Sequence, residues 1–513
     1  MQVAITGITG NMGQATLSEV VKIERIDKFK FLVLPDDKRI KKLLRKYRSY
    51  KNKIEIIYGN LKDREVCDRL VSGCDYVINL AAVIPPHSDQ DPQSAIDCNE
   101  TGVKNLVKAI ESCENQPKYI HISTVALYGN RNYHHPWGQV GDPLLVSPYD
   151  IYSATKLRGE FYVLESEIKT WVVLRQTAML HINMLKDNMS DGLMFHTCFN
   201  APLEWATAHD SGLLIANILR KDMAEDLSKF FWKHIFNIGG GEENCITGFD
   251  TLNDGFKLIG GSAKDFFKPY YNATRNFHGM WFYDSKLLDK LFDYQKQTTD
   301  EYWKEIAKKY WCYNLGKAVP KSVISTFAIK RLFKSKNAPA YWYKHHDEAK
   351  MIAYFKGVDK YEKLGKDWSK FNLLVESKGE NGEEIDYLKL RKRENAKLID
   401  YYFNIDNYEN ITIKDLQNVA HAHGGELLSK NFDDLYQKLE WLTQDGEKFT
   451  ATAFTVMKGG HWYNRIYSEN VWDFDRLSKK DKIFAQIWLD SHDESENNLY
   501  YFDENFTAKI ERR

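Results

Sequence analysis

A tyrosine and a lysine four residues apart are the pair in this sequence best suited to move a proton. Tyr152 and Lys156 lie at positions i and i+4 of an expected helix that continues to Ile168, so they share one face of it. A protonated lysine there can lower the pKa of the tyrosine, which then serves as general acid or base on a carbinol or carbonyl oxygen. Thr124, at the end of an expected strand, can orient that oxygen with its hydroxyl. Such a pair also occurs by chance on exposed helices, so by itself it leaves a structural role open.

The first thirteen residues combine an apolar strand, three spaced glycines and the start of a helix. Gly7 permits a tight turn, Gly10 lets the backbone approach a pyrophosphate, and Gly13 lets the helix pack closely on the strand. The N–H groups at the start of that helix then face the phosphates. The turn predicts that a dinucleotide binds through Gly7, Thr9, Gly10, Asn11, Met12 and Gly13.

Residues that follow the next three expected strands complete a dinucleotide site. After the second strand, the carboxylate of Asp36 can accept hydrogen bonds from the ribose hydroxyls of NAD, whereas Lys38 and Arg39 could pair with the extra phosphate of NADP. The choice between NAD and NADP stays open, and the same residues could instead form a solvated charged turn. After the third and fourth strands, the residues placed to meet the dinucleotide are Asn60, Leu61, Ala81 and Ala82.

The elements that must position these residues alternate between strands and helices. Apolar strands are expected at 2–6, 29–34, 54–58, 75–80 and 118–123, with helices between them at 38–48, 63–71 and 93–111. Near-continuous apolar strands separated by helices are typical of an α/β fold with a doubly wound, Rossmann-like parallel sheet. Ligands bind such sheets at the carboxyl ends of the strands, which is where the candidate residues lie.

Composition narrows the class of protein. The 71 lysines and arginines balance 71 aspartates and glutamates, so net charge gives no argument for nucleic acid or an anionic membrane as the main partner. The seven cysteines all precede residue 313 without a CxxC pair, and no signal peptide precedes the first strand. No apolar run approaches the roughly 18–20 residues of a membrane span. We expect a soluble, cytoplasmic protein that acts on a small molecule.

With these residues assembled, about the first 315 residues resemble the extended branch of the short-chain dehydrogenase/reductase superfamily, the NAD-dependent epimerase/dehydratase family. The resemblance rests on the glycine turn, on Tyr152 with Lys156, and on segments 79–82, 99–102, 123–129, 174–177, 205–210 and 236–239. It implies hydride exchange with a nicotinamide, with Tyr152 as acid/base, Lys156 on the cofactor ribose and Thr124 polarising the substrate oxygen. It also implies a homodimer formed through a four-helix face and substrate contacts from Val83, Ile84 and Thr177.

Departures from the family's pattern bear on the substrate. Val125 and Ala126 replace the acidic pair that runs the elimination in sugar-nucleotide 4,6-dehydratases, so that reaction is not expected. Gln176 replaces the usual proline after the late arginine, and segment 179–202 offers methionines instead of a cluster of phosphate-binding arginines. We therefore expect an NAD(P)-dependent oxidoreductase acting on a secondary alcohol or ketone. The alternatives are a nucleotide-sugar epimerase that retains its NAD and a dinucleotide-sensing scaffold.

The last 200 residues or so change in character, because they lack cysteine and are rich in lysine, tyrosine and tryptophan. We expect domains at 1–315, with a substrate part at about 176–235 and 240–315, a helical connecting region at 316–410 and a third region at 411–513. Helices are predicted at 339–361 and 387–404. Aromatic side chains among basic ones could stack on nucleic-acid bases. Interleaved acidic residues weaken any basic stripe, so we favour subunit assembly or coverage of the active site.

The third region resembles a treble-clef zinc module, of the kind found attached to nucleases, that has lost its metal ligands. The double glycine at 424–425, Trp441, Gly446 and Trp462 follow the spacing of that module. The places of its cysteines hold Leu427, Thr443, Tyr463 and Ile466, and the place of its histidine holds Glu447. Tetrahedral zinc needs thiolate or imidazole ligands there, so the sequence predicts no metal site and a core held by aromatic packing.

Overall fold

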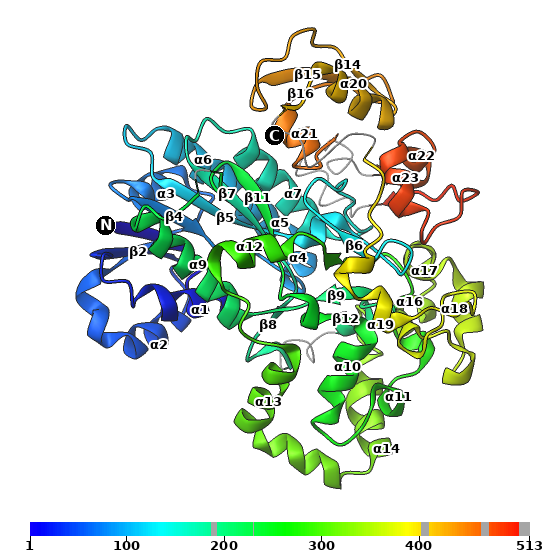
Figure 1. Ribbon diagram of the computed structural model, residues 1–513. Coiled ribbons are helices and arrows are strands. Elements are labelled where there is room, and N and C mark those ends of the chain that lie inside the picture. Colours follow the sequence, from blue (N-terminus) through cyan, green and yellow to red (C-terminus); the bar gives the residue numbers. More distant parts are fainter. Residues whose placement is uncertain (186–191, 229, 402–409, 463–470, 502–513) are drawn as a thin grey trace.

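The computed structural model describes residues 1–185, 192–228, 230–401, 410–462 and 471–501. Within these residues, seven parallel strands form one sheet in the order β11-β7-β5-β4-β1-β2-β3 (Figure 1). The strands are β1 (Gln2–Thr6), β2 (Lys28–Val33), β3 (Ile54–Tyr58), β4 (Tyr76–Asn79), β5 (Lys118–Thr124), β7 (Trp171–Gln176) and β11 (His234–Ile238). The expected doubly wound parallel sheet is confirmed.

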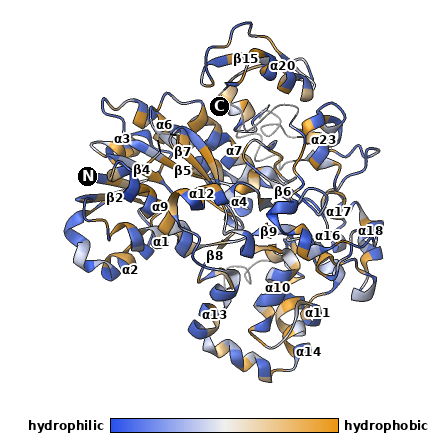
Figure 2. Cartoon of the chain, in the orientation of Figure 1, coloured by the Kyte–Doolittle hydropathy of each residue, from blue (hydrophilic) through white to orange (hydrophobic). Residues whose placement is uncertain are grey.

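Helices cover both faces of this sheet because successive strand residues point to opposite sides. Val3, Ile5 and Phe31 bury one face together with α1 (Asn11–Val20), α2 (Arg39–Lys46), α9 (Ala208–Met223) and α12 (Ser285–Phe292). Ala4, Leu32 and Val77 bury the other face together with α3 (Arg64–Val71), α6 (Gly102–Glu111) and α7 (Ile151–Leu164). Figure 2 shows the central strands as largely hydrophobic, which agrees with their burial on both sides.

The helix predicted at 93–111 forms as one run with a widened turn inside it. α5 (Pro92–Ala95) leads into a π-helical segment (Ile96–Thr101) and then into α6. A π turn interrupts the regular hydrogen-bond pattern of a helix and is frequent at functional sites. Here it carries Asn99, which is buried.

Short strand pairs and helices build a small lobe beside the sheet. The pairs are β8 (Met179–Leu180) with β10 (Ala206–Thr207), β9 (Pro202–Glu204) with β12 (Cys245–Thr247), and β6 (Trp137–Gly138) with β13 (Trp281–Phe282). Its helices are α10 (Gly248–Lys257), α11 (Ala263–Phe266) and α13 (Thr299–Lys309), while the short α4 (His87–Gln90) follows β4. Figure 1 shows α10, α11 and α13 below the sheet.

The C-terminal residues lie along the small lobe and over α7 (Figure 1). One group comprises α14 (Lys321–Ile324), α15 (Lys330–Leu332), α16 (Pro339–Lys344), α17 (Glu348–Phe355), α18 (Val358–Leu364) and α19 (Tyr387–Leu390). A second comprises α20 (Ile413–Ala422), the antiparallel strands β14 (Glu426–Leu427), β15 (Lys438–Leu442) and β16 (Lys448–Thr452), and α21 (Ala453–Met457). The third comprises β17 (Val471–Trp472), α22 (Phe474–Ser478), α23 (Lys482–Trp488) and β18 (Tyr500–Tyr501).

The second group packs directly on α7. The backbone N–H and the hydroxyl of Thr452 donate to Glu165 Oε1 at 2.9 and 3.1 Å, and Phe161 packs against the hydrophobic core of that group. The Phe454 ring lies 5.8 Å from the ring of Trp171. This part of α7 is therefore covered within the chain, and the expected homodimer stays a prediction.

Residues of all three predicted regions share one hydrophobic cluster. It joins Ile96 and Leu157 of the first region to Trp342 of the second and to Phe474 and Trp488 of the third. The C-terminal residues are thus part of the core that packs on α7 and on the residues after β5. In the described part of the chain, no helix has the length and apolar character needed to cross a membrane.

Two predicted helices are wrong in extent. The helix expected at 339–361 is three helices, because His346 and Lys356 have positive φ (55° and 61°) and Asp347 caps a new helix. The helix expected at 387–404 ends at Leu390. Beyond it, Lys392 is extended and its ammonium binds Glu242 at 2.8 Å.

Candidate active site

The glycine turn after β1 has the conformation that a dinucleotide site requires. Gly7 has a φ of +68°, and a Cβ there would lie 2.7 Å from Ala81 N. A Cβ at Gly13 would lie 2.3 Å from Gly7 O, so helix and turn can approach this closely only with glycine. Gly10 is the N-cap residue of α1, and no side-chain cap is present among the described residues. The first N–H groups of α1 are therefore available to an anion.

Asp37, rather than the predicted Asp36, contacts this turn. The Thr9 hydroxyl donates to Asp37 Oδ2 at 2.6 Å, and Arg39 donates to both carboxylate oxygens at 2.8 Å. The hydrogen bonds from Arg39 lower the pKa of Asp37 to about 2, against the effect of partial burial. Asp36 and Lys38 are exposed. A backbone turn, closed by Asp37 N donating to Leu34 O at 3.0 Å, brings the second of the two aspartates to the glycines.

Of the candidate residues that follow β3 and β4, some lie in the core and others at the surface. Ala82 and Ile84 are exposed, and Ile84 has 55% of its surface in solvent. Leu61 is only 4% exposed, and a Cβ on Gly102 would lie 2.6 Å from its Cβ. The Leu61 side chain therefore belongs to the core against α6, and the predicted cofactor contact stays a prediction. Asn60 is half-buried and accepts a hydrogen bond from Lys62 N.

Tyr152, Lys156 and Thr124 meet where β5 ends and α7 begins. The side chain of Thr124 lies beside the Tyr152 hydroxyl. Burial raises the pKa of Tyr152 to about 12, and the neighbouring Thr124 side chain offsets part of the shift. Lys156 is 1% exposed and donates from Nζ to Ile122 O at 2.6 Å. Burial lowers the pKa of Lys156 to about 8. The structure thus brings together the three residues that the sequence predicts to act in acid/base catalysis.

Asn99 clamps the loop after β4 to α7. Its Oδ1 accepts from Val83 N at 2.8 Å, and its Nδ2 donates to Val83 O at 2.9 Å and to Thr155 Oγ1 at 3.1 Å. The predicted substrate contact Val83 is therefore held by its backbone. Segment 99–102 is one of the segments in which the sequence resembles the family. The hydrogen bonds of Asn99 could not be predicted from sequence spacing, because they depend on the π turn.

Gln176, the last residue of β7, and Thr177, which follows it, have different surroundings. Thr177 is buried and its hydroxyl donates to Glu204 O at 2.5 Å, so its side chain stabilises the small lobe, and the predicted substrate contact stays a prediction. The neighbouring Gln176 has a buried Oε1 that accepts no hydrogen bond from any described residue. A ligand donor could satisfy that oxygen.

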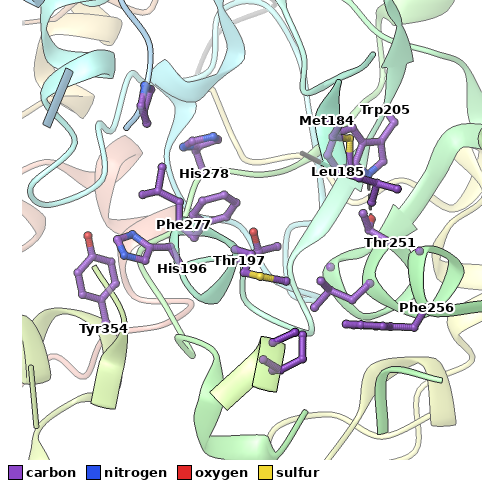
Figure 3. A pocket seen from close by; sticks show the side chains of 18 of the residues that line it. Met184, Leu185, His196, Thr197, Trp205, Thr251, Phe256, Phe277, His278 and Tyr354 are labelled. Atoms are coloured by element: carbon purple, nitrogen blue, oxygen red, sulfur yellow. Dashed lines mark hydrogen bonds between the residues drawn. The ribbon is translucent and has the colours of Figure 1, made fainter. Parts of the chain in front are cut away.

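A cavity of roughly 720 Å³ is lined by Tyr152 and by residues of the small lobe and the C-terminal region. This volume is within the range of small-molecule sites. Figure 3 shows its two sides, one with His196, His278 and Tyr354 and the other with Met184, Leu185, Trp205 and Phe256. Sequence reasoning missed most of this lining, because segments far apart in the chain supply it.

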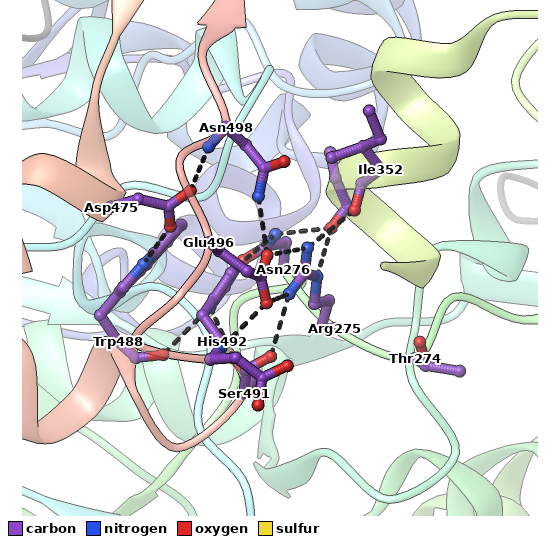
Figure 4. Close-up of polar contacts among 12 residues, drawn as sticks. Thr274, Arg275, Asn276, Ile352, Asp475, Trp488, Ser491, His492, Glu496 and Asn498 are labelled. Carbon is purple, nitrogen blue, oxygen red and sulfur yellow. Dashed lines mark hydrogen bonds and ion pairs between the residues drawn. The ribbon is translucent and has the colours of Figure 1, made fainter. Parts of the chain in front are cut away.

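Arg275 ties one wall of this cavity to the C-terminal residues (Figure 4). Its buried guanidinium donates at 2.8 to 3.1 Å to the carbonyl oxygens of Ile352, Ala353 and Ser491. Two further hydrogen bonds of 2.9 Å go to the carboxylate of Glu496. Since residues 276–278 line the cavity, the C-terminal region holds that wall in place.

A second buried arginine joins the C-terminal region to α7. Arg175 pairs with Glu160, one helical turn beyond Lys156, and donates to Gly459 O at 2.6 Å. His461 Nε2 lies 3.0 Å from Glu160 Oε1. The Glu160 charge opposes part of the effect of burial on the pKa of Lys156. The C-terminal region thus reaches the back of the helix that carries Tyr152 and Lys156.

The first third of the chain matches a known family. Residues 3–173 match the "NAD dependent epimerase/dehydratase family". This confirms the expected resemblance over the first five strands of the sheet, the glycine turn and the segment with Tyr152 and Lys156, and it supports an NAD-dependent enzyme.

Two solved structures illustrate the similarity. UDP-glucuronic acid 4-epimerase from Bacillus cereus in complex with NAD is 20% identical, with 61% of this chain and 98% of that chain covered and a TM-score of 0.45. dTDP-glucose 4,6-dehydratase from Bacillus anthracis in complex with NAD is 16% identical, with 62% and 98% covered and a TM-score of 0.46.

The expected likeness of residues 411–513 to a zinc module gains no support. Among the described residues, no group of three histidine, cysteine, aspartate or glutamate side chains could hold a metal ion. Leu427, Thr443 and Glu447 lie in or beside the sheet β14–β16, while Tyr463 and Ile466 lie outside the described residues. Aromatic packing does form this core, with ring centroids 5.2 to 6.4 Å apart among Trp441, Phe449 and Trp462.

Proposed function

We propose that this protein is an NAD-dependent oxidoreductase that reduces a ketone, or oxidises the corresponding secondary alcohol, by hydride exchange with a nicotinamide. The observation that carries the proposal is the placement of Tyr152 in the cavity wall and beside Thr124, with Lys156 buried one turn along α7. The family match covers all three residues.

The residues around the glycine turn fit a dinucleotide. The uncapped start of α1 would bind its phosphates, and the exposed Ala82 would pack against it. The carboxylate of Asp37 would accept the adenosine ribose hydroxyls and repel an extra phosphate, which favours NAD over NADP. Gln176 Oε1 offers a buried acceptor. When bound, the nicotinamide supplies or accepts the hydride.

Tyr152 holds the proton that the reaction needs. Because its pKa is raised to about 12, the phenol is protonated at neutral pH and donates its proton as a carbonyl oxygen is reduced. Thr124, which lies beside Tyr152, orients the same oxygen. Lys156 places a cation in a low-dielectric site, where it holds the ribose and stabilises the phenolate that forms.

The test is turnover of NADH and NADPH with simple methyl ketones, with binding of both dinucleotides titrated in parallel. We expect NADH to bind and to be oxidised, and NADPH to bind more weakly. Binding of neither dinucleotide would overturn the proposal. NAD retained through purification, without net turnover of added cofactor, would favour the epimerase instead.

A further inference from the structure

The cavity beside Tyr152 has a polar side and an apolar chamber. The polar side carries Tyr152, Asp150, His278 and Tyr354. The chamber is formed by aliphatic and aromatic side chains of the small lobe and the C-terminal region: Met184, Leu185, Leu193, Met194, Leu252, Phe256, Leu258, Ile259, Trp303, Ile324, Ala328 and Ile329. Apolar surface of this extent is stabilised by an apolar ligand.

The charges of this lining do not suit a phosphate. Among the described lining residues there is no lysine or arginine, although a diphosphate is usually bound by such cations. Its carboxylates are Asp89 and Asp150, and Asp150 accepts two hydrogen bonds from Ser153 and lies 3.5 Å from His278 Nδ1. His196 is neutral at physiological pH, because burial lowers its pKa to about 4. A nucleoside diphosphate would therefore meet carboxylates and hydrocarbon without a counter-charge.

We infer that the substrate is an uncharged ketone or secondary alcohol with a hydrocarbon body and no phosphate, whose oxygen binds at Tyr152 and Thr124 while its body fills the chamber. This inference rests on the proposed function for the position of the oxygen. It assigns the C-terminal region a role in specificity, since Ile324, Ala328 and Ile329 close the chamber.

The test is binding to the full chain saturated with NAD, in which a ketone cannot be reduced and calorimetry reports binding alone. The probes are 2-hexanone, 2-octanone and 2-decanone, the fused-ring trans-2-decalone, UDP and UDP-glucose. Each added methylene should strengthen binding by about fourfold, the value for complete burial of that group. 2-Decanone and trans-2-decalone contain the same number of carbons, so the tighter binder shows whether the chamber prefers a linear or a fused-ring body.

Binding of UDP or UDP-glucose more tightly than any ketone would overturn the inference, as would ketone affinity that does not depend on chain length. The same titration without dinucleotide separates the two proposals. If NAD fails to bind while ketone affinity still rises with chain length, the proposed function fails and the substrate class stands. If NAD binds and the ketones do not, only the substrate class fails.

Ala328→Trp fills the chamber and should weaken 2-decanone binding by about tenfold or more while leaving NAD affinity unchanged. Thr326→Trp is the matched control, because Thr326 is an exposed neighbour that does not line the cavity. Leu252→Gln, at a half-buried lining position, provides a second variant if Ala328→Trp does not fold. Equal effects of Ala328→Trp and Thr326→Trp in folded proteins would place the ketone elsewhere.

Discussion

The cofactor end of the active site is shaped mainly by backbone, whereas the substrate end is shaped mainly by side chains. At the cofactor end, Gly7 and Gly13 form the turn by leaving space for neighbouring backbone. At the substrate end, the walls come from segments as far apart as Pro85 and Tyr354, and Glu496 holds the arginine beneath one of them. Different residues therefore determine the reaction and the substrate, so one can change without the other.

The largest expected effect comes from replacing Tyr152, the proposed proton donor between the cofactor end and the substrate end of the active site. Tyr152→Phe removes the proton donor and should lower kcat for ketone reduction by about a thousandfold, within the usual range for loss of general acid catalysis. The affinity for NADH should stay within about twofold of wild type, because the phenol ring is kept. Steady-state kinetics and a dinucleotide titration measure both. A loss of kcat below about tenfold would assign the proton to another group.

The backbone character of the cofactor end is tested by two alanine substitutions in the same conformation. Gly7 and Gly73 have φ of +68° and +65°, but a Cβ at Gly73 meets nothing within 4 Å, whereas one at Gly7 meets the backbone of Ala81. Gly73→Ala should lose about 1 kcal/mol of stability from the left-handed conformation, and Gly7→Ala should lose more, because its Cβ also meets backbone. Only Gly7→Ala should also weaken NAD binding, roughly tenfold to a hundredfold. Equal NAD affinity of the two variants would show that this contact is not needed.

The burial of Lys156 predicts a pH dependence of stability. Its pKa is lowered from 10.5 to about 8, so between these values the unfolded chain binds more protons than the native protein. The free energy of unfolding should therefore rise with pH across this window, by up to about 3 kcal/mol. Lys156→Met lacks this contribution. The free energy of unfolding of Lys156→Met minus that of wild type should therefore be largest at neutral pH. It should fall by up to about 3 kcal/mol toward pH 10.5.

Urea unfolding of wild type and Lys156→Met across this pH range provides the measurement. The difference between the two proteins cancels the titration of other groups. If the two stability curves run parallel, the lysine titrates in the native protein as it does in the unfolded chain.

At the substrate end, Glu496→Gln replaces a charged partner of Arg275 by a neutral one. This change should raise KM for ketones by about threefold to tenfold, as expected when one charge-assisted hydrogen bond is weakened. NAD affinity and kcat should change little, because the glycine turn and Tyr152 are not involved. Glu494→Gln, at an exposed position of the same segment, is the control. A fall in kcat without a change in KM would contradict a role in holding the cavity wall.

The smallest expected effect concerns the choice of dinucleotide. Asp37→Ser removes the carboxylate beside the glycine turn. The ratio of NADH affinity to NADPH affinity should then fall by about fivefold, because a partly screened repulsion between this carboxylate and the extra phosphate of NADPH is lost. Asp36→Ser is the matched control at the exposed neighbour. If Asp36→Ser has the larger effect, the residue first expected from the sequence binds the ribose.

The sequence was informative where function depends on close neighbours in the chain. The glycine turn and the pair Tyr152 and Lys156 have fixed local spacing, and Thr124 follows a strand whose apolar pattern is clear. The choice of Asp37 over Asp36 could not be predicted, since it depends on the turn that follows β2. The burial of Leu61 depends on Gly102, which lies in another element. Long-range contacts of this kind have no local pattern.

The short helix at Tyr387–Leu390 shows the same limit. Residues 387–404 have the composition of a longer helix, but their partner Glu242 lies far earlier in the chain. The cavity wall at 276–278 likewise depends on carbonyl oxygens from residues that follow it by many positions. Contacts between distant segments override local propensity in both places.

The order of these segments along the chain has a consequence for biosynthesis. The last strand of the nucleotide-binding sheet ends at Ile238, whereas the partners of Arg275 come from residues 352–353 and 491–496. A growing chain therefore leaves the ribosome with its cofactor turn and sheet complete while the substrate cavity still lacks a wall. Cofactor present during translation can bind and stabilise this first part before the last residues arrive.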